Sequence, residues 1–236
     1  MQSILKTVRR AVQTYDMIAD GDKIAVGVSG GKDSTVLLAA LAKLSQFYPK
    51  KFSVVGITVD QRFETRDGDF SAIQSFCREQ TIEYLIESTD IWEIVFKVRQ
   101  EDNPCSLCSR MRKGALYETA KRLGCNKVAL GHHLDAAAVT FYMNLLNNGT
   151  LSCFSPVTVL PEKGLTVIRP LCLTDERDVM HAVGTQNIPI VKSRCPVNGN
   201  TDRSKTVDLI KTLGKDYKNI KEKTVGAMQR AHLCGW

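Results

Sequence analysis

The sequence has no long apolar run. No stretch approaches the roughly 18 apolar residues of a membrane-spanning helix, and segment 1–18 is amphipathic, with acidic and basic residues among the apolar ones. It lacks both the continuous apolar stretch and the cleavage site of a secretory signal. These absences predict a cytoplasmic protein with no membrane partner.

Repeats and low-complexity linkers are also absent. The 236 residues are 43% hydrophobic and 24% charged, which is the composition of a globular protein and excludes a wholly disordered chain. This length suits one domain, or one domain with a small additional lobe.

A second metal-binding motif is missing as well. Of the eight cysteines, only Cys105 and Cys108 form a C-x-x-C pair, and no H-x-x-x-H accompanies them to complete a four-ligand zinc site. Because thiols stay reduced in the cytoplasm, we do not expect these eight cysteines to form structural disulfides. Cys77 and Cys125 lie beside apolar residues, and we expect them in the core.

The C-x-x-C pair begins a predicted helix, and arginines follow it. A helix N-terminus and nearby cations lower the pKa of a thiol, so we expect this pair to bind metal or to do redox chemistry. The pair alone does not distinguish zinc, an iron–sulfur cluster and a transient disulfide. Cys195, after the strand-like run 188–191, is the best third thiolate. Three cysteines on a cubane would leave one iron open to exogenous sulfur.

Short apolar runs alternate with amphipathic helical patterns along most of the chain. Five runs are predicted strands, at 23–28, 53–59, 83–86, 127–130 and 166–168. The predicted helices are 34–47, 70–80, 91–99, 106–123, 134–146, 174–185, 202–213 and 217–230. Strand followed by helix, repeated in this way, predicts an α/β fold with a doubly wound, mostly parallel sheet of about five strands.

The expected organisation has three parts. An N-terminal helix occupies 1–20, the α/β domain with the cysteine pair occupies 21–196, and a basic helical region occupies 197–236. Residues 192–230 contain ten Lys and Arg against four Asp and Glu, which is +6 of the net charge of +7. Such a segment suits phosphate contacts to a polyanion, although a merely solvated face would look the same.

A glycine- and serine-rich loop follows the first predicted strand. Ser29-Gly30-Gly31-Lys32-Asp33-Ser34 opens a helix, where glycines let the backbone approach an anion and amides point toward it. It is neither G-x-x-x-x-G-K-[ST] nor G-x-G-x-x-G. It resembles the PP-loop, S-G-G-x-D-S, of the N-type ATP pyrophosphatases, which break the α–β bond of ATP. The resemblance implies a Rossmann-like PP-loop fold that binds ATP through Ser29, Gly30, Gly31, Lys32, Asp33 and Ser34, with Asp60 bordering the nucleoside.

From about Lys23 to Pro196 the chain is similar to the tRNA 2-thiolation enzymes of the TtcA/TtuA group, the 2-thiocytidine and 2-thiouridine synthetases. The motifs that carry this likeness are PCSLCSRMR, GHHLD and IRPL, together with SGGKDS. The resemblance implies a [4Fe-4S] cluster on Cys105, Cys108 and Cys195, beside ATP with Mg²⁺. Arg112 matches a basic residue near the reacting centre, and Gly131 and Asp135 match an ATP-binding and catalytic motif.

The resemblance also implies a reaction. A pyrimidine carbonyl of tRNA becomes adenylated, pyrophosphate leaves, and sulfur delivered through the cluster displaces AMP. Lys32 and Arg112 would stabilise the phosphate charge. The RNA contacts expected on this basis are Arg194, Arg203, Lys205 and Lys211. The other partners expected are a sulfur donor, either sulfide or a cysteine desulfurase, and a second copy of the chain in a homodimer.

One position departs from the family pattern. The family usually has a second Asp after G-H-x-x-D, and this chain has Ala136. Two alternatives therefore stay open. The first is a PP-loop enzyme that thiolates another acceptor through a persulfide on Cys105 or Cys108. The second is an RNA-binding homologue with impaired catalysis. The short architecture, without an RNA-binding extension or zinc-finger cysteines, favours cytidine in the anticodon loop over uridine.

Overall fold

The computed structural model describes residues 1–100, 104–195 and 202–236. The strands are β1 (Asp22–Gly27), β2 (Phe52–Asp60), β3 (Glu83–Ser88), β4 (Lys127–Ala129), β5 (Val157–Leu160) and β6 (Leu165–Ile168). The helices are α1 (Gln2–Thr14), α2 (Lys32–Ser45), α3 (Ser71–Glu79), α4 (Ile91–Glu93), α5 (Pro104–Arg122), α6 (Leu134–Asn148), α7 (Glu176–Thr185), α8 (Asp202–Asp216) and α9 (Ile220–Arg230). Short 3₁₀ turns occupy Phe63–Thr65, Pro161–Lys163 and Leu233–Gly235, and a π-helical turn occupies Ile94–Arg99.

All of the strands belong to one sheet, in the order β3-β2-β1-β4-β6-β5. Every pairing is parallel except β5 with β6. The chain order reverses between β1 and β4, and in open α/β sheets ligands bind outside the carboxyl ends of the strands at such a reversal. The predicted fold class is confirmed, and the topology places the loop after β1 at this position.

The sheet has six strands, one more than expected. The additional strand is β5, a four-residue edge strand that begins after Pro156 and ends before Pro161. The run 188–191, in contrast, forms no strand. Pro189 has no N–H to donate to a ladder, and the Val191 amide donates instead to the carbonyl of Gly30, at 2.9 Å.

Two helix predictions also need correction. The helix expected over 91–99 is a short α-helix followed by a π-helical turn. The helix expected from Thr174 begins at Glu176, because the Asp175 side chain accepts from the Arg177 amide and caps the N-terminus.

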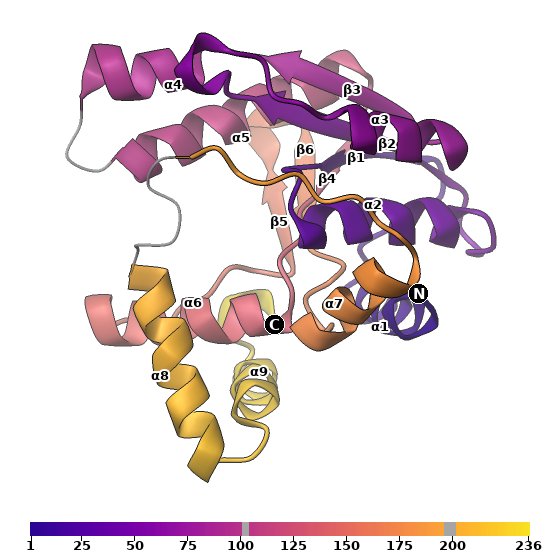
Figure 1. The fold of residues 1–236 in the computed structure, drawn as a ribbon. Helices are drawn as coiled ribbons and strands as arrows, with labels where there is room; N and C mark the ends of the chain where they lie inside the picture. The colour runs from indigo at the N-terminus through magenta and orange to yellow at the C-terminus, as the bar shows by residue number, and fades with distance from the viewer. Residues whose placement is uncertain (101–103, 196–201) are drawn as a thin grey trace.

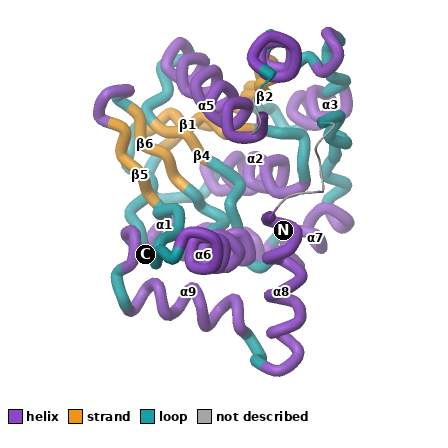
Figure 2. Tube along the Cα trace, turned by 90° about the vertical axis from the view of Figure 1, so that its left-hand side faces the viewer, coloured by secondary structure: helices purple, strands orange, loops and turns teal. Residues whose placement is uncertain are grey.

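Helices cover both faces of the sheet (Figure 1). One face carries α5, whose Leu116 and Ala120 pack on Ala25, Val55 and Val128. The other face carries α1, α2, α3 and α7 in the larger core. Figure 2 shows α8 and α9 beyond α6, and Ile210 of α8 packs on Ala138 and Val139 of α6. Within the described ranges, every helix is too short or too polar to cross a membrane.

The division into three parts stays a prediction. Helix α1 and helix α9 both contribute buried side chains to the larger core, including Val8 and Val225. The loop VNGNT (197–201) and the boundary between 196 and 197 lie outside the described residues.

The C-terminal residue closes this core. Trp236 is 5% exposed, its indole N–H donates to the Phe154 carbonyl at 2.7 Å, and its ring contacts Tyr15 and Phe154. Phe154 in turn lies against His132, so the C-terminus supports a loop at the carboxyl end of the sheet.

Replacing Trp236 with Ala should lower the free energy of unfolding by about 3 kcal/mol, because the change removes a buried ring and leaves a cavity. Urea denaturation followed by circular dichroism measures this. The matched control is Tyr217→Ala, at an aromatic side chain that is 59% exposed, where we expect a loss within about 0.5 kcal/mol. Equal losses in the two variants would contradict a packing role for Trp236.

Candidate active site

The loop between β1 and α2 is folded around Ser34. The Ser29 amide donates to Ser34 Oγ at 3.0 Å, and Ser34 Oγ donates to the Gly31 carbonyl at 2.9 Å. Gly30 has a φ of +83°, a conformation that favours glycine, and Gly31 stands at the N-cap of α2. The start of a helix presents unpaired amides to an anion. The predicted phosphate loop therefore has the local structure expected of it.

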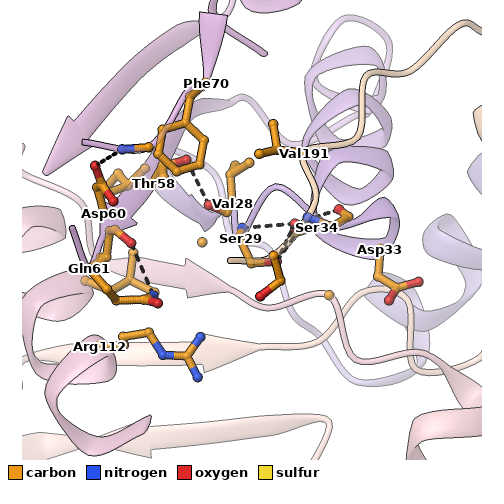
Figure 3. Close-up of a pocket in the computed structure, with 18 of the residues that line it drawn as sticks. Val28, Ser29, Asp33, Ser34, Thr58, Asp60, Gln61, Phe70, Arg112 and Val191 are labelled. Atoms are coloured by element: carbon orange, nitrogen blue, oxygen red, sulfur yellow. Dashed lines mark hydrogen bonds between the residues drawn. The ribbon is translucent and has the colours of Figure 1, made fainter. Parts of the chain in front are cut away.

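A cavity of about 600 Å³ opens beside this loop. Figure 3 shows Phe70 and Arg112 on opposite sides of it, with Ser29 and Ser34 between them. Its walls come from the loop after β1, the end of β2 and the following loop, α5, the loop after β4, and residues 191–194. Of the predicted ATP-binding residues, it is lined by Ser29, Gly31, Asp33, Ser34, Asp60 and Gly131. The volume suits a nucleotide-sized ligand.

Gly131 brings the end of β4 against the start of α2. A Cβ at this position would lie 3.0 Å from the carbonyl carbon of Asp33 and 3.0 Å from the amide nitrogen of Ser34. Only glycine allows so close an approach of two backbone segments. The role of Gly131 in this structure is therefore steric.

The carboxylate of Asp60 is occupied by its own loop. One oxygen accepts from the Arg62 amide at 3.0 Å and the other from the Gly68 amide at 2.7 Å. Asp60 thus closes the loop between β2 and α3, which carries Phe63 and Phe70 on the cavity wall. A place for Asp60 beside the nucleoside stays a prediction.

Lys32 is held between two carboxylates. Its Nζ lies 2.8 Å from Glu176 Oε1 and 3.2 Å from Asp33 Oδ1. Burial acts to lower the pKa of Lys32, but the hydrogen bond to Glu176 and the charge of Asp33 outweigh it, so the pKa is raised. The side chain is therefore a stable cation at the edge of the phosphate loop.

Asp135 is buried and does not line the cavity. One carboxylate oxygen accepts from Lys221 of α9, and the other accepts from the Glu176 amide at 2.8 Å. Burial acts to raise the pKa of Asp135, but the neighbouring His133 and Lys221 side chains and the hydrogen bond from the Glu176 amide hold it well below its usual range. Both oxygens are engaged, so this arrangement fits a capping role for Asp135 rather than binding of Mg²⁺.

The residue after Asp135 is the buried Ala136, where the family pattern has a second Asp. Its amide donates to Nδ1 of His133, at 3.4 Å, which caps α6. In the described part of the chain, no group of three or more His, Cys, Asp and Glu is placed to hold one metal ion.

His132 follows Gly131 in the loop after β4. It lines the cavity, and its ring lies 4.8 Å from that of Phe154. Burial, followed by the charges of Arg169 and Arg203, lowers the pKa of His132 to about 3, so the imidazole is neutral near pH 7. Its buried Nδ1 has no hydrogen-bond partner, and a buried unpaired nitrogen in a cavity wall suits a polar ligand.

Cys105 and Cys108 lie in the first turns of α5, and Arg112 stands one turn further on, in the cavity wall. Burial raises the pKa of Cys108, and the charges of Cys195 and Cys105 add to the effect against that of Arg112. The expected lowering of this pKa was therefore wrong, because burial outweighs the nearby cation. Cys77 and Cys125 are buried, as predicted.

The segment that leads to Cys195 approaches the C-x-x-C pair, although the residues are far apart in sequence. In Figure 1 the segment that leads to Cys195 crosses the sheet toward the N-terminal end of α5. As placed here, the three thiols do not form a ligand group for one metal ion, so a cluster held by Cys105, Cys108 and Cys195 stays a prediction.

The four predicted RNA contacts differ in their surroundings. Arg194 donates to three backbone carbonyls of the loop after β2. Arg203, Lys205 and Lys211 belong to α8, where Lys211 pairs with Asp208 at 3.2 Å. The three residues on α8 therefore stay candidates for RNA binding.

The sequence profile of the PP-loop domain family matches residues 3–195. A tRNA-cytidine(32) 2-sulfurtransferase of Geobacter sulfurreducens is 37% identical over 96% of this chain and 89% of its own length. The chain belongs to this PP-loop family of tRNA 2-sulfurtransferases. A second relative of the same name, from Dechloromonas aromatica, is 38% identical over 95% of this chain and 79% of its own length.

A solved structure supports the same family assignment. The U34-tRNA thiolase NcsA from Methanococcus maripaludis, with its [4Fe-4S] cluster, matches with a TM-score of 0.77 and 26% identity, over 97% of this chain and 78% of its own. The resemblance to tRNA 2-sulfurtransferases that was drawn from the motifs is confirmed.

Replacing Asp135 with Asn should lower the free energy of unfolding by about 2 kcal/mol at pH 7, because a charged pair loses one partner. A carboxyl group with a lowered folded-state pKa stabilises the protein above its unfolded pKa of about 3.9, and this contribution disappears as the pH falls through the folded-state pKa. Urea denaturation of wild type and variant between pH 3 and pH 8 measures the difference.

The control for this prediction is Lys221→Met, alone and combined with Asp135→Asn. The two single changes should be clearly non-additive, because they break one ion pair. A stability difference for Asp135→Asn that grows below pH 4 would contradict the assignment.

Proposed function

We propose that this chain is an ATP-dependent tRNA 2-thiolation enzyme. The observation that carries the proposal is that one cavity joins the PP-loop to both cysteine-bearing segments. Arg112 of α5, just beyond the C-x-x-C pair, and residues 191–194, just before Cys195, line the same cavity as Ser29 and Ser34. Cys105, Cys108 and Cys195 do not line the cavity themselves, but a nucleotide held there would lie beside the two segments that carry them.

In this proposal the PP-loop binds the pyrophosphate part of ATP. The amides at the start of α2 and the hydroxyl of Ser29 donate to phosphate oxygens, and Lys32 supplies positive charge. Arg112, on the opposite wall, stabilises the charge that develops when the α–β bond breaks. Adenylation of the pyrimidine carbonyl turns a poor leaving oxygen into AMP. Mg²⁺ with the ATP phosphates remains a prediction.

Cys105, Cys108 and Cys195 would hold the [4Fe-4S] cluster. A cluster with three protein thiolates has one iron free for an exogenous sulfur ligand, which is the chemistry such a group supplies here. We expect the sulfur to come from sulfide or from a cysteine desulfurase. A persulfide on Cys105 or Cys108 is the alternative carrier, and the raised pKa of Cys108 counts against that residue as a nucleophile.

The substrate we propose is cytidine in the anticodon loop of tRNA, at position 32 as in the names of the relatives. A base in a loop can be unstacked and enter a cavity, whereas a paired base must first be extracted. Helix α8 carries Arg203, Lys205 and Lys211, the residues we propose for contact with the RNA backbone. A cytoplasmic location and a homodimer belong to the same proposal.

A second candidate rests on one observation. Ala136 replaces a carboxylate and Asp135 is neutralised by Lys221, so the chain could bind RNA without catalysis. Pyrophosphate release separates the two candidates.

An active enzyme should release pyrophosphate from ATP in a tRNA-dependent manner, and Lys32→Ala should reduce that rate by about 100-fold, because a cation near the transferred phosphate is lost. A coupled phosphate assay under anaerobic conditions measures this. Lys50→Ala, which removes a surface cation paired with Asp16, is the matched control and should leave the rate unchanged. The absence of tRNA-dependent release from a folded chain that binds tRNA would favour the second candidate.

Anaerobically purified protein should contain about four irons and four sulfides per chain, and Cys195→Ala should lose most of them, because two thiolates do not retain a cubane. Iron and acid-labile sulfide analysis with an absorption spectrum measures the content. Cys77→Ala, at a buried thiol of the core, should keep the iron. Zinc, or an iron content that does not depend on Cys195, would refute the cluster.

A further inference from the structure

Residues 191–194 form one wall of the nucleotide cavity and lead directly to Cys195; we call them the wall segment. The wall segment is attached to the PP-loop at its first residue. The Val191 amide donates to the Gly30 carbonyl at 2.9 Å, and a Cβ on Gly30 would lie 3.0 Å from Val191 Cβ. The two segments are therefore packed without spare room.

Arg194, the last residue of the wall segment, attaches this segment to a second loop, the one after β2. Arg194 is exposed, yet its guanidinium donates from Nη2 to the Phe63 carbonyl at 2.8 Å and from Nη1 to the Asp67 carbonyl at 3.1 Å. A longer contact of 3.5 Å runs from Nη1 to the Arg66 carbonyl. A planar guanidinium with several fixed donors suits a set of carbonyls that converge from one loop.

The loop that Arg194 contacts is strained. Arg62, Glu64 and Thr65 have φ values of 50°, 57° and 60°, a left-handed conformation that is unfavourable for residues other than glycine. Such a conformation persists only where surrounding contacts determine it. Those contacts include the Asp60 carboxylate, which accepts from the amides of Arg62 and Gly68, the ion pairs of Arg62 with Asp67 and Asp90, and the Arg194 guanidinium.

Both attachment points belong to the nucleotide cavity. The loop after β2 contributes Phe63, Gly68 and Phe70 to its wall, and the PP-loop contributes Ser29 and Gly31. A nucleotide that filled the cavity would contact both loops at once. Its contacts would then act on the two loops to which the wall segment is attached.

We propose that Arg194 is a positioning residue that couples nucleotide binding to the placement of Cys195. Nucleotide binding restricts the motion of the loop after β2. The hydrogen bonds of Arg194 to this loop then restrict the wall segment, and Cys195 is held in place relative to Cys105 and Cys108. The RNA contact expected from the charge of Arg194 stays a separate prediction. The inference deepens the proposed function and rests on it, because it gives the nucleotide control over the third thiolate. By linkage, thiolates held in place raise the affinity for the nucleotide by the same factor.

The variant Arg194→Lys separates the two roles. A lysine keeps the positive charge that an RNA phosphate would attract, but its single ammonium cannot reproduce the contact of a planar fork with several carbonyls. The matched control is Arg203→Lys, the same substitution at a predicted RNA contact on α8.

The test uses the full-length chain, freed of iron by a chelator under non-denaturing conditions, and the ATP analogue with a methylene group between the α- and β-phosphates. The alkylation rate of Cys195 and the hydrogen exchange of residues 62–68 are followed by peptide mass spectrometry, with saturating analogue and without it. In wild type, the analogue should slow both by at least about fivefold, the lower end of ordinary coupling between sites. In Arg194→Lys the slowing at Cys195 should fall below about twofold, and in Arg203→Lys it should stay at the wild-type value.

Two results would overturn the inference. One is an Arg194→Lys variant that keeps the wild-type slowing, and the other is a wild-type chain in which bound analogue leaves Cys195 unaffected. A loss of tRNA affinity in Arg194→Lys, with unchanged protection of Cys195, would also overturn the inference and would support the RNA contact expected of Arg194. These measurements need neither cluster nor tRNA, so failure of thiolation refutes the proposed function and failure of the coupling refutes only the role of Arg194.

Discussion

The site depends on the contact between the end of β4 and the start of α2. Gly131 leaves only 3.0 Å between a would-be Cβ and the backbone of Asp33 and Ser34, so no other residue lets the two segments meet in this way. The contact fixes the N-terminus of α2 at the reversal of strand order, where amides and hydroxyls face the cavity. The loop after β2, helix α5 and the wall segment then build the other sides of the cavity around this point.

The C-terminal helices are part of the charge arrangement at the site. Lys221 of α9 pairs with Asp135, the amide of Glu176 donates to the same carboxylate, and the Glu176 side chain pairs with Lys32. A continuous chain of polar contacts thus runs from α9 to the PP-loop. The basic C-terminal segment, which the sequence suggested as either an RNA-binding or a merely solvated surface, therefore also supplies a structural cation that neutralises Asp135.

Features that depend on neighbouring residues were predicted well from the sequence. Contacts between residues far apart in the chain were not. The Ser29–Ser34 loop was recognisable because glycines, hydroxyls and a helix start are consecutive in sequence, and the parallel strands because they are apolar on both faces. Strand β5 was missed because prolines flank four residues on a sheet edge. Lys221 and Asp135 pair across 86 positions of the sequence, so no local pattern reveals the pair. Arg194 donates to backbone carbonyls, which every residue has, so the sequence does not show which residues it contacts. The raised pKa of Cys108 depends on burial, which motif spacing does not report.

The most direct test of the account is nucleoside analysis of tRNA after reaction with the purified chain. The full-length protein with its iron intact is incubated anaerobically with unmodified tRNA, ATP and sulfide, and the digested tRNA is analysed by mass spectrometry. The account predicts 2-thiocytidine that forms only when ATP is present. Tight binding of both ATP and tRNA with no thiolated nucleoside would contradict it and would identify the chain as an RNA-binding relative of these enzymes.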